Sequence, residues 1–279
     1  MIQNGQSETT GVFGYPVITT TPNHPGRSFT FNGGSRVTQG VAFDNLSIRT
    51  INDEQMQTFE ELIERLTPDG LNYGETHGGG LSWYLGATME AGTAMLYATL
   101  GFGGLSITNF LPGTPLFENW IRAFDRFIGA CNLGGLAYEL FPAFDQGQAD
   151  YAMAAATRSG HLLTLQAGLK AELNAMTGGS GEVPLFLRQP SSWTVNSVGY
   201  NMAQSAAILS DVDTALANPT KLILCGPQYA NPHYRAGDVH TDAEGKHWEG
   251  ISLGRAIQNY RTGAATKATR KRSRANIKA

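Results

Sequence analysis

Four short segments of the sequence carry residue types that together could catalyse acyl transfer. Gly5-Gln6-Ser7 supplies a hydroxyl, and Asp238-Val239-His240 supplies an imidazole with a carboxylate two residues upstream. Gly103-Gly104 and Gln146-Gly147-Gln148 supply backbone N–H groups and side-chain amides. A serine hydroxyl is a weak nucleophile near neutral pH and needs a base, while the oxyanion that its attack creates needs preorganised donors.

Under this hypothesis each segment has a role. Ser7 is the candidate nucleophile and His240 its general base. Asp238 can orient the imidazole, because residues i and i+2 of an extended segment face the same side. The candidate oxyanion donors all carry an N–H group: the backbone of Ser7, the backbone of Gly103 or Gly104, and the amide of Gln148. Loss of one such donor typically costs roughly 3–4 kcal/mol of transition-state stabilisation.

The elements that must position these segments can be predicted from the apolar runs. Five short runs predict buried strands near 1–3, 95–100, 136–143, 183–188 and 220–225. Amphipathic helical stretches separate the later runs, a pattern typical of βαβ units and a parallel sheet. The sequence therefore predicts an α/β fold, a three-layer α/β/α sandwich around a mainly parallel five-stranded sheet. Ligands of such folds bind beyond the carboxyl ends of the strands, where the candidate residues fall.

One domain, residues 1–263, is predicted, followed by a basic tail at 264–279. Residues 11–50 are rich in Thr, Pro, Gly and Asn without clear periodicity, so we expect a long loop there, and 11–80 as a largely loop and helix insertion after the first strand. The tail holds six basic residues and no acid. It is interpreted as a solvated tail or linker, with contact to nucleic acid or an acidic partner as the alternative.

The composition narrows the function class. Hydrophobic residues make up 41%, enough for a sizeable core, and no apolar run of about 18 residues predicts a membrane span. Charged residues are only 15%, against about 25% in ordinary globular chains, which favours an extracellular or virion protein over a nucleic-acid binder. The sequence shows no secretory signal. Cys131 and Cys225 lie in apolar contexts and are expected to be core residues rather than a disulfide.

Each candidate residue also has a structural interpretation. A serine after Gly-Gln is usually a turn residue, and a single histidine is more often structural than catalytic. His233 and His247 are alternative bases, although His247 is expected to be a packing residue of a helix. His77 is interpreted as a solvated loop residue, with a place in the pocket as the alternative. A different hypothesis takes Asp238, His240 and Asp242 as ligands of a divalent metal ion.

Taken together, the four segments resemble the SGNH hydrolases, in particular the sialate O-acetylesterase-like branch and the esterase domains of phage tail spikes. Gly5-Gln6-Ser7 matches the family's first block, and residues 103–107 resemble its second block with one insertion. Residues 146–150 resemble the third block, and Asp238-Val239-His240 resembles the last. The loop Ser28–Val37 is similar to the phage-type subset. The resemblance spans about residues 1–262.

The resemblance implies a carbohydrate O-acetylesterase that needs no metal or organic cofactor. Ser7 would attack the acetyl carbonyl, and water would release the acetyl-enzyme. Gln146 joins Gly103, Gly104 and Gln148 as an oxyanion- or substrate-binding residue. The implied substrate is an acetylated bacterial surface polysaccharide, and the implied location is a virion tail or the extracellular space. Other tail or virion proteins are implied partners, with a homotrimer as an open assembly state and no membrane or nucleic-acid partner.

Two features depart from the family pattern. Gln148 stands where the family has Glu, and Asp238-Val239-His240 is one residue shorter than the widespread Asp-x-x-His spacing. A Ser–His dyad oriented by a backbone carbonyl is therefore an alternative to the triad. A non-catalytic glycan-binding or structural tail-spike domain on the same fold is the alternative function.

Overall fold

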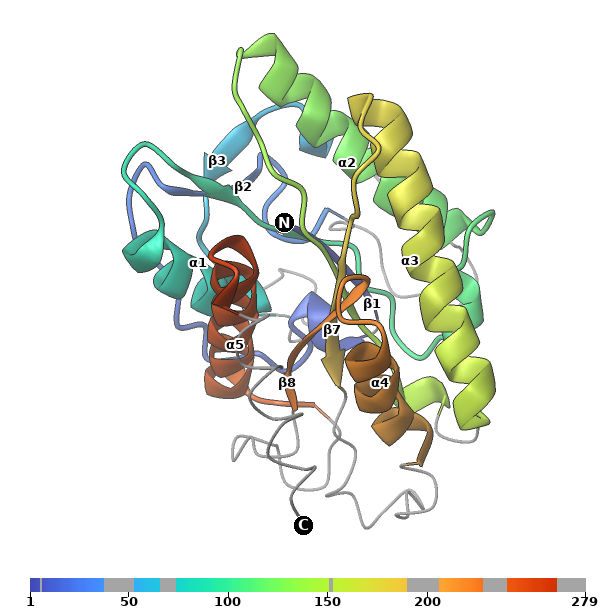
Figure 1. Ribbon diagram of the computed structural model, residues 1–279. Helices are drawn as coiled ribbons and strands as arrows, with labels where there is room; N and C mark the ends of the chain where they lie inside the picture. Colours follow the sequence, from blue (N-terminus) through green and yellow to red (C-terminus); the bar gives the residue numbers. More distant parts are fainter. Residues whose placement is uncertain are drawn as a thin grey trace.

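The molecule is built on a five-stranded, all-parallel sheet (Figure 1). The computed structural model describes residues 1–5, 7–37, 53–65, 74–150, 153–189, 206–227 and 240–264. The strands are β1 (Ile2–Gly5), β5 (Ala98–Thr99), β6 (Pro142–Asp145), β7 (Leu185–Gln189) and β8 (Leu222–Pro227). Their order is β5-β1-β6-β7-β8, so the second strand of the sheet lies outside the first, as in flavodoxin-like folds.

Helices cover both faces of this sheet. They are α1 (His77–Thr88), α2 (Pro115–Leu133), α3 (Ala155–Thr177), α4 (Ala206–Ala217) and α5 (Ala243–Arg261). In Figure 1 α2 and α3 lie on one side of the strands, and α1 and α5 lie side by side on the other. The predicted three-layer α/β/α sandwich is confirmed.

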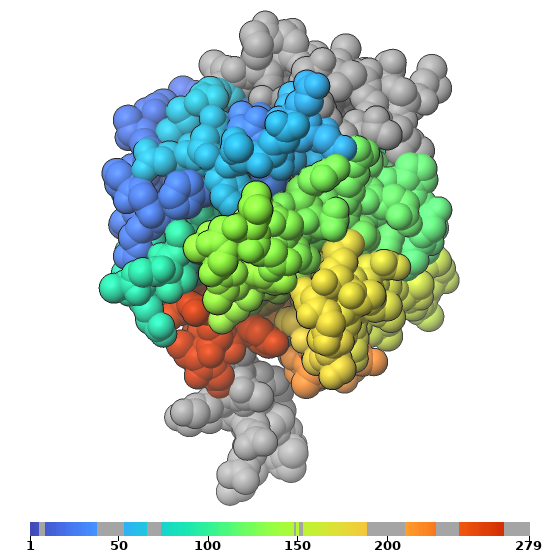
Figure 2. Space-filling model, turned by 90° about the horizontal axis from the view of Figure 1, so that it is seen from above, coloured from blue at the N-terminus to red at the C-terminus, as the bar shows by residue number. Residues whose placement is uncertain are grey.

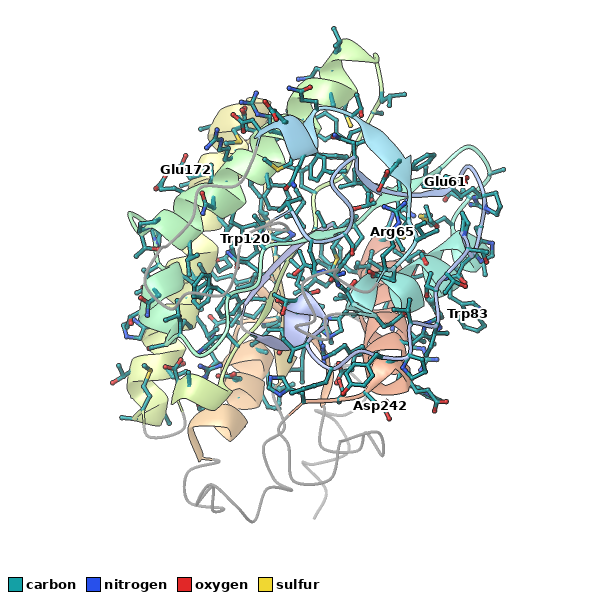
Figure 3. The ribbon with its side chains drawn as sticks, turned by 180° about the vertical axis from the view of Figure 1, so that it is seen from behind. Glu61, Arg65, Trp83, Trp120, Glu172 and Asp242 are labelled. Atoms are coloured by element: carbon teal, nitrogen blue, oxygen red, sulfur yellow. The ribbon has the colours of Figure 1, made fainter. Side chains whose placement is uncertain are left out.

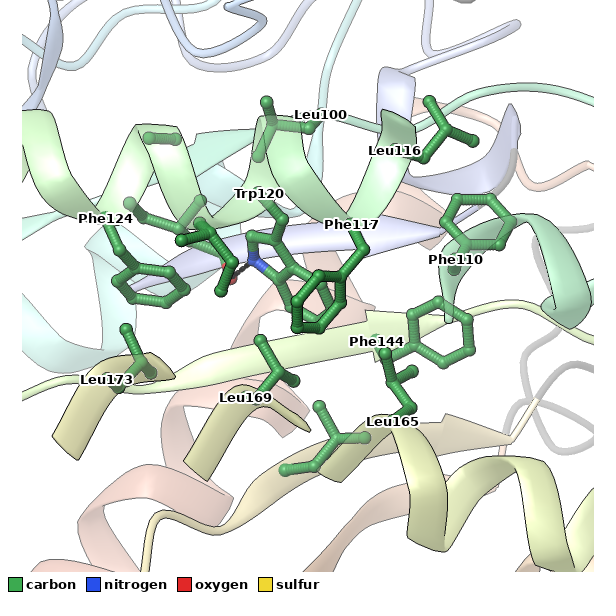
Figure 4. Close-up of a cluster of buried hydrophobic side chains, with 14 of the residues drawn as sticks. Leu100, Phe110, Leu116, Phe117, Trp120, Phe124, Phe144, Leu165, Leu169 and Leu173 are labelled. Carbon is green, nitrogen blue, oxygen red and sulfur yellow. Dashed lines mark hydrogen bonds between the residues drawn. The ribbon is translucent and has the colours of Figure 1, made fainter. Parts of the chain in front are cut away.

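Strands β6, β7 and β8 carry apolar side chains on both faces, as a sheet covered on both sides requires, whereas β1 buries the polar Gln3 and Asn4. Phe144 of β6 points to the α2–α3 layer, where it packs against Trp120 with ring centroids 6.1 Å apart (Figure 4). The Trp120 indole donates to the carbonyl oxygen of Ile2 at 3.1 Å, which satisfies its buried N–H. The neighbouring Ala143 belongs to the other cluster, with Phe186, Leu81 and Leu253 under α1 and α5.

Local signals in the sequence explain where the helices begin. Thr114 caps α2 by accepting from the N–H of Phe117, and Pro115 occupies the first turn, where its missing N–H costs nothing. Asp242 caps α5 by accepting from the N–H of Gly245 at 2.8 Å. Helix α1 lies very close to α5, since a Cβ on Gly80 would come 1.7 Å from the carbonyl oxygen of His247.

The predicted loop at 11–50 is wrong in one part, because the structure contains a second small sheet. Its strands are β2 (Ser28–Phe31), β3 (Phe59–Glu61) and β4 (Met95–Leu96), in the order β3-β2-β4. The single strand predicted at 95–100 is divided between the two sheets as β4 and β5. Ser28 and Thr30 are buried polar residues of β2, so the strand has no apolar run to signal it.

Charged contacts attach the segment that precedes β3 to α2. The short 3-10 helix η2 (Asp53–Met56) places Asp53 beside Arg122 and Arg126 of α2. In Figure 2 the light-blue segment that contains η2 lies against the green segment that contains α2. Both cysteines are buried and unpaired, as predicted. Among the described helices, none combines the length and apolar character that crossing a bilayer requires.

Candidate active site

The register of the sheet brings the carboxyl ends of its central strands together. Gly5 at the end of β1 pairs with Asp145 at the end of β6, and Asp145 pairs with Arg188 of β7. The segments that follow these strands therefore leave the sheet at a common edge. This edge is where ligands of doubly wound α/β folds bind, and α5 begins there at Asp242, which is labelled in Figure 3.

The first loop leaves the sheet through Gly5, which no other residue could replace without a shift. Its φ is +145°, and an added Cβ would lie 2.0 Å from the carbonyl oxygen of Asp145. The Gly5 carbonyl accepts from the N–H of Phe102 at 2.7 Å, so the loop after β5 is tied to the loop after β1. Ser7 then begins the 3-10 helix η1 (Ser7–Thr10). The chain thus turns sharply at Gly5, two residues before the candidate nucleophile Ser7.

The second loop follows β5, and its glycines, Gly103 and Gly104, come directly after Phe102, whose N–H is bonded to Gly5. Gly103 is half-buried and Gly104 is exposed, with a φ of +73° and open space where a Cβ would stand. The loop ends in the 3-10 helix η3 (Ile107–Phe110), which Ser106 caps. The backbone at Gly104 is therefore accessible, and its predicted part as an oxyanion donor stays a prediction.

The third loop is fixed by a buried arginine. Gln146 donates from Nε2 to the carbonyl oxygen of Leu105 at 2.9 Å, and its Oε1 accepts from Arg158 Nη1 at 2.9 Å. Asp150, at the end of the 3-10 helix η4 (Gln148–Asp150), accepts from the N–H of Ile107 and from Arg158, both at 2.9 Å. Gln146 therefore ties the second and third loops together, and its predicted contact with substrate is untested.

The last predicted segment is described from His240 onward, and Asp238 lies outside the described residues, as does His233. His240 is half-buried, and its ring makes an edge contact with Phe13, with centroids 5.4 Å apart. Phe13 lies three residues after η1. The structure thus brings the chain that follows the candidate nucleophile to the candidate base.

Two further histidines, His77 and His247, have structural contacts. The interpretation of His77 as a solvated loop residue is wrong, because it is fully buried as the first residue of α1. His247 lies in α5, as expected, half-buried, with its ring centroid 6.5 Å from that of Trp83 and Nδ1 3.4 Å from Glu75 Oε1. Within the described ranges no three His, Cys, Asp or Glu side chains are grouped as metal ligands, and the Asp238-His240-Asp242 reading depends on a residue outside those ranges.

A buried polar cluster under the candidate site was not predicted from the sequence. Arg188 Nη1 lies 3.0 Å from Asp145 Oδ2, and Arg188 Nη2 forms an ion pair with Glu249 Oε1 of α5 at 3.0 Å. Glu249 Oε2 lies 3.0 Å from Nε2 of His77. A sequence signal existed, since an arginine directly after the apolar run Leu185-Phe186-Leu187, in the same predicted strand, needs a buried partner.

The charges of this cluster are set by burial and by Arg188. Burial and then the Arg188 charge lower the pKa of His77 from 6.5 to about 3, so its ring is neutral at pH 7. Burial opposes ionisation of Glu249, but Arg188 and the His77 hydrogen bond outweigh it and lower the pKa of the Glu249 carboxyl. Nε2 of His77 lies 3.0 Å from Glu249 Oε2 and 2.6 Å from Arg188 Nη1, and Nδ1 lies 3.1 Å from Gln3 Oε1.

Comparison with known proteins places the fold. No protein-family model matches the chain, and no curated protein sequence matches it. A solved structure of the Arabidopsis thaliana protein AT4G34215 superposes with a TM-score of 0.61 at 15% identity, covering 92% of this chain and 98% of that chain. A solved structure of NanS superposes with a TM-score of 0.61 at 13% identity, covering 94% of this chain and 97% of that chain. The shared feature is the fold.

Proposed function

We propose that the protein is a serine esterase that removes O-acetyl groups from carbohydrate. The observation that carries the proposal is the contact between Phe13 and His240, which joins the segment after Ser7 to the segment that supplies the base. The fold shared with NanS along nearly the whole of both chains supports it as well. So does the sequence resemblance to the sialate O-acetylesterase-like branch of the SGNH hydrolases.

In the proposed mechanism His240 removes the proton of the Ser7 hydroxyl as Oγ attacks the acetyl carbonyl carbon. The tetrahedral oxyanion accepts hydrogen bonds from the N–H of Ser7, from Gly103 or Gly104, and from Gln148. His240 then gives the proton to the departing sugar oxygen as the ester bond breaks. Water, activated by the same imidazole, hydrolyses the acetyl-enzyme to acetate and free Ser7. The residue that orients His240 in this scheme is Asp238 or a backbone carbonyl.

The substrate and location are proposed on the sequence resemblance alone. They are an O-acetylated bacterial surface polysaccharide and a virion tail or extracellular site. Association with other tail or virion proteins, including a homotrimer, belongs to the same proposal.

The experiment is acetate release from 4-nitrophenyl acetate and from an acetylated bacterial polysaccharide. Ser7→Ala and His240→Ala should each lower kcat by more than a thousandfold, because the nucleophile and its base act as a unit. Ser180→Ala, in the exposed turn after α3, is the matched control and should keep full turnover. A fluorophosphonate should label Ser7 in the wild type.

Two outcomes would overturn the proposal. One is undiminished turnover by Ser7→Ala. The other is a folded wild-type protein that neither releases acetate nor reacts with the fluorophosphonate. If the wild-type protein in this second outcome still binds the polysaccharide, the non-catalytic glycan-binding function replaces the proposed esterase.

A further inference from the structure

We propose that Glu249 is a positioning residue that holds the His240 segment at the edge of the sheet by way of Thr241. The inference rests on the proposed function, because it takes His240 as the base. Glu249 lies in the second turn of α5, nine residues after His240. It acts through its neighbours and is assigned no contact with substrate.

The first step is the attachment of the His240 segment to α5. Thr241, the residue after His240, is fully buried, and its hydroxyl lies 3.4 Å from Glu249 Oε2. Asp242, the next residue, caps the helix by accepting from the N–H of Gly245. The two residues that follow the candidate base are thus both held by the first two turns of one helix.

The second step is the attachment of Glu249 to the sheet. Its other carboxylate oxygen, Oε1, pairs with Arg188 Nη2 at 3.0 Å. Arg188 in turn reaches Asp145 Oδ2 at 3.0 Å, and Asp145 is paired in the sheet with Gly5. A chain of contacts therefore runs from the residue beside the base to the strand end that precedes Ser7.

The third step is that the cluster fixes the Glu249 carboxylate in place. His77 Nε2 lies 3.0 Å from its Oε2, and His77 Nδ1 lies 3.1 Å from Gln3 Oε1, which accepts from the Tyr97 hydroxyl at 2.8 Å. All of these side chains are buried. Replacing buried ion pairs by apolar side chains of similar volume is often neutral or stabilising in proteins, so a buried ion pair is weak evidence for a role in stability and is consistent with a positioning role.

Positioning of this kind affects the rate more than the binding of substrate. A misplacement of about 1 Å at a reacting group can cost roughly a hundredfold in rate. If Thr241 loses its hydrogen bond, His240 keeps its chemistry but not its fixed place. We therefore expect kcat to fall while KM changes little.

The test compares two substitutions of Thr241 with 4-nitrophenyl acetate as substrate. Thr241→Val keeps the branched shape but removes the hydroxyl, and it should lower kcat about tenfold with KM within twofold of wild type. Thr241→Ser keeps the hydroxyl and should restore kcat to within threefold. Thr30→Val is the matched control: the Thr30 hydroxyl is buried without a hydrogen-bond partner among the described residues, so kcat should not change.

A second measurement does not depend on turnover. Hydrogen exchange of the backbone amides at 240–242 should be at least tenfold faster in Thr241→Val than in the wild type, and close to wild type in Thr241→Ser. Glu249→Gln should show the same faster exchange and the same fall in kcat. If Glu249→Gln does not fold, the two Thr241 variants decide the question by themselves.

The two proposals fail in different ways. If Ser7→Ala keeps full turnover, the proposed function is wrong, and the exchange rates alone judge the positioning of the 240–242 segment. If Ser7→Ala and His240→Ala are inactive but Thr241→Val matches wild type in kcat and in exchange, only the positioning role is overturned. Equal impairment of Thr241→Ser and Thr241→Val would overturn it too.

Discussion

At Gly5 a side chain has no room, because an added Cβ would lie 2.0 Å from the carbonyl oxygen of Asp145. The backbone there also has a φ of +145°, which residues with a Cβ rarely adopt. We expect Gly5→Ala to lower the free energy of unfolding by more than about 3 kcal/mol, since a conformational cost of roughly 1–2 kcal/mol adds to a backbone clash. Urea unfolding followed by circular dichroism measures this.

Gly92→Ala is the control for the conformational cost alone. Gly92 has a φ of +81°, but its Cβ would meet open space. The free energy of unfolding of Gly92→Ala should therefore be about 1–2 kcal/mol below that of the wild type. Equal losses at Gly5 and Gly92 would show that the close approach to Asp145 carries no cost, contrary to the geometry.

Phe13 is the residue whose ring contacts His240, and the contact tests whether the first loop orients the base. Phe13→Leu keeps an apolar side chain but loses the edge contact, which in aromatic pairs is worth about 0.5–1.5 kcal/mol. We expect kcat for 4-nitrophenyl acetate to fall about three- to tenfold with little change in melting temperature. Phe127→Leu, which removes a similar ring contact with Tyr138, should leave kcat unchanged. Equal kcat values in the two variants would contradict this role.

At the scale of elements, Arg158 of α3 joins three segments around the second and third loops. Its guanidinium is fully buried and pairs with Asp150 at 2.9 Å and with Asp211 of α4 at 2.7 Å. Gln146 and Asp150 pass this restraint on to the loop at Leu105–Ile107. The second and third loops, which carry Gly103, Gly104 and Gln148, are therefore held by one side chain.

Arg158→Met should leave two buried carboxylates without their partner. We expect a loss of about 3–5 kcal/mol in the free energy of unfolding, the usual cost of breaking a buried pair from one side. Lys170→Met removes an exposed cation from Glu182 and should cost about 0–1 kcal/mol. Thermal and urea unfolding of both variants measures the contrast. Similar losses in the two would mean that the Arg158 contacts contribute no more than a surface pair.

The sequence predicts the strands of the main sheet well and the small sheet poorly, for a physical reason. Strands buried on both faces are continuous apolar runs, as in Leu185-Phe186-Leu187, and they can be recognised without knowledge of their neighbours. Strand β2 buries Ser28 and Thr30 instead, so its place depends on pairing with distant residues. Predicted strand ends are displaced for the same reason: β6 begins only at Pro142, and the predicted residues before it lie in an exposed segment.

The candidate site divides in a similar way. The meeting of loops that follow strand ends, such as those at Gly5 and Phe102, can be predicted from order alone, because parallel strands end at one edge. The contacts that hold them depend on tertiary structure. Arg188, Glu249 and His77 are separated by 61 to 172 positions. Glu249 by itself indicates a solvated surface, and Arg188 next to an apolar run indicates a buried partner without identifying it. Only the fold shows that they are buried together.

At the scale of the whole molecule, two buried groups make opposite contributions to the dependence of stability on pH. The pKa of His77 is lowered from 6.5 to about 3 by burial, so below pH 6.5 the unfolded chain binds a proton that the native chain does not. Burial raises the pKa of Glu64 from 4.5 to about 7, so above pH 4.5 the unfolded chain releases a proton that the native chain keeps. His77 therefore makes the native protein less stable as the pH falls below 6.5. Glu64 makes it less stable as the pH rises above 4.5.

Between pH 4.5 and 6.5 these two effects oppose each other, each with a slope of at most about 1.4 kcal/mol per pH unit. Glu64→Gln should therefore gain stability relative to wild type as pH rises through this window, by up to roughly 2–3 kcal/mol. His77→Gln should lose stability relative to wild type over the same rise, by a similar amount. Urea unfolding at pH 4.5, 5.5 and 6.5 measures both differences, and comparison with wild type removes the contribution of every other titrating group. The two variants should change in opposite directions relative to wild type, because native His77 and native Glu64 are both uncharged across this window. If both variants change in the same direction, one of the two groups is charged in the native protein.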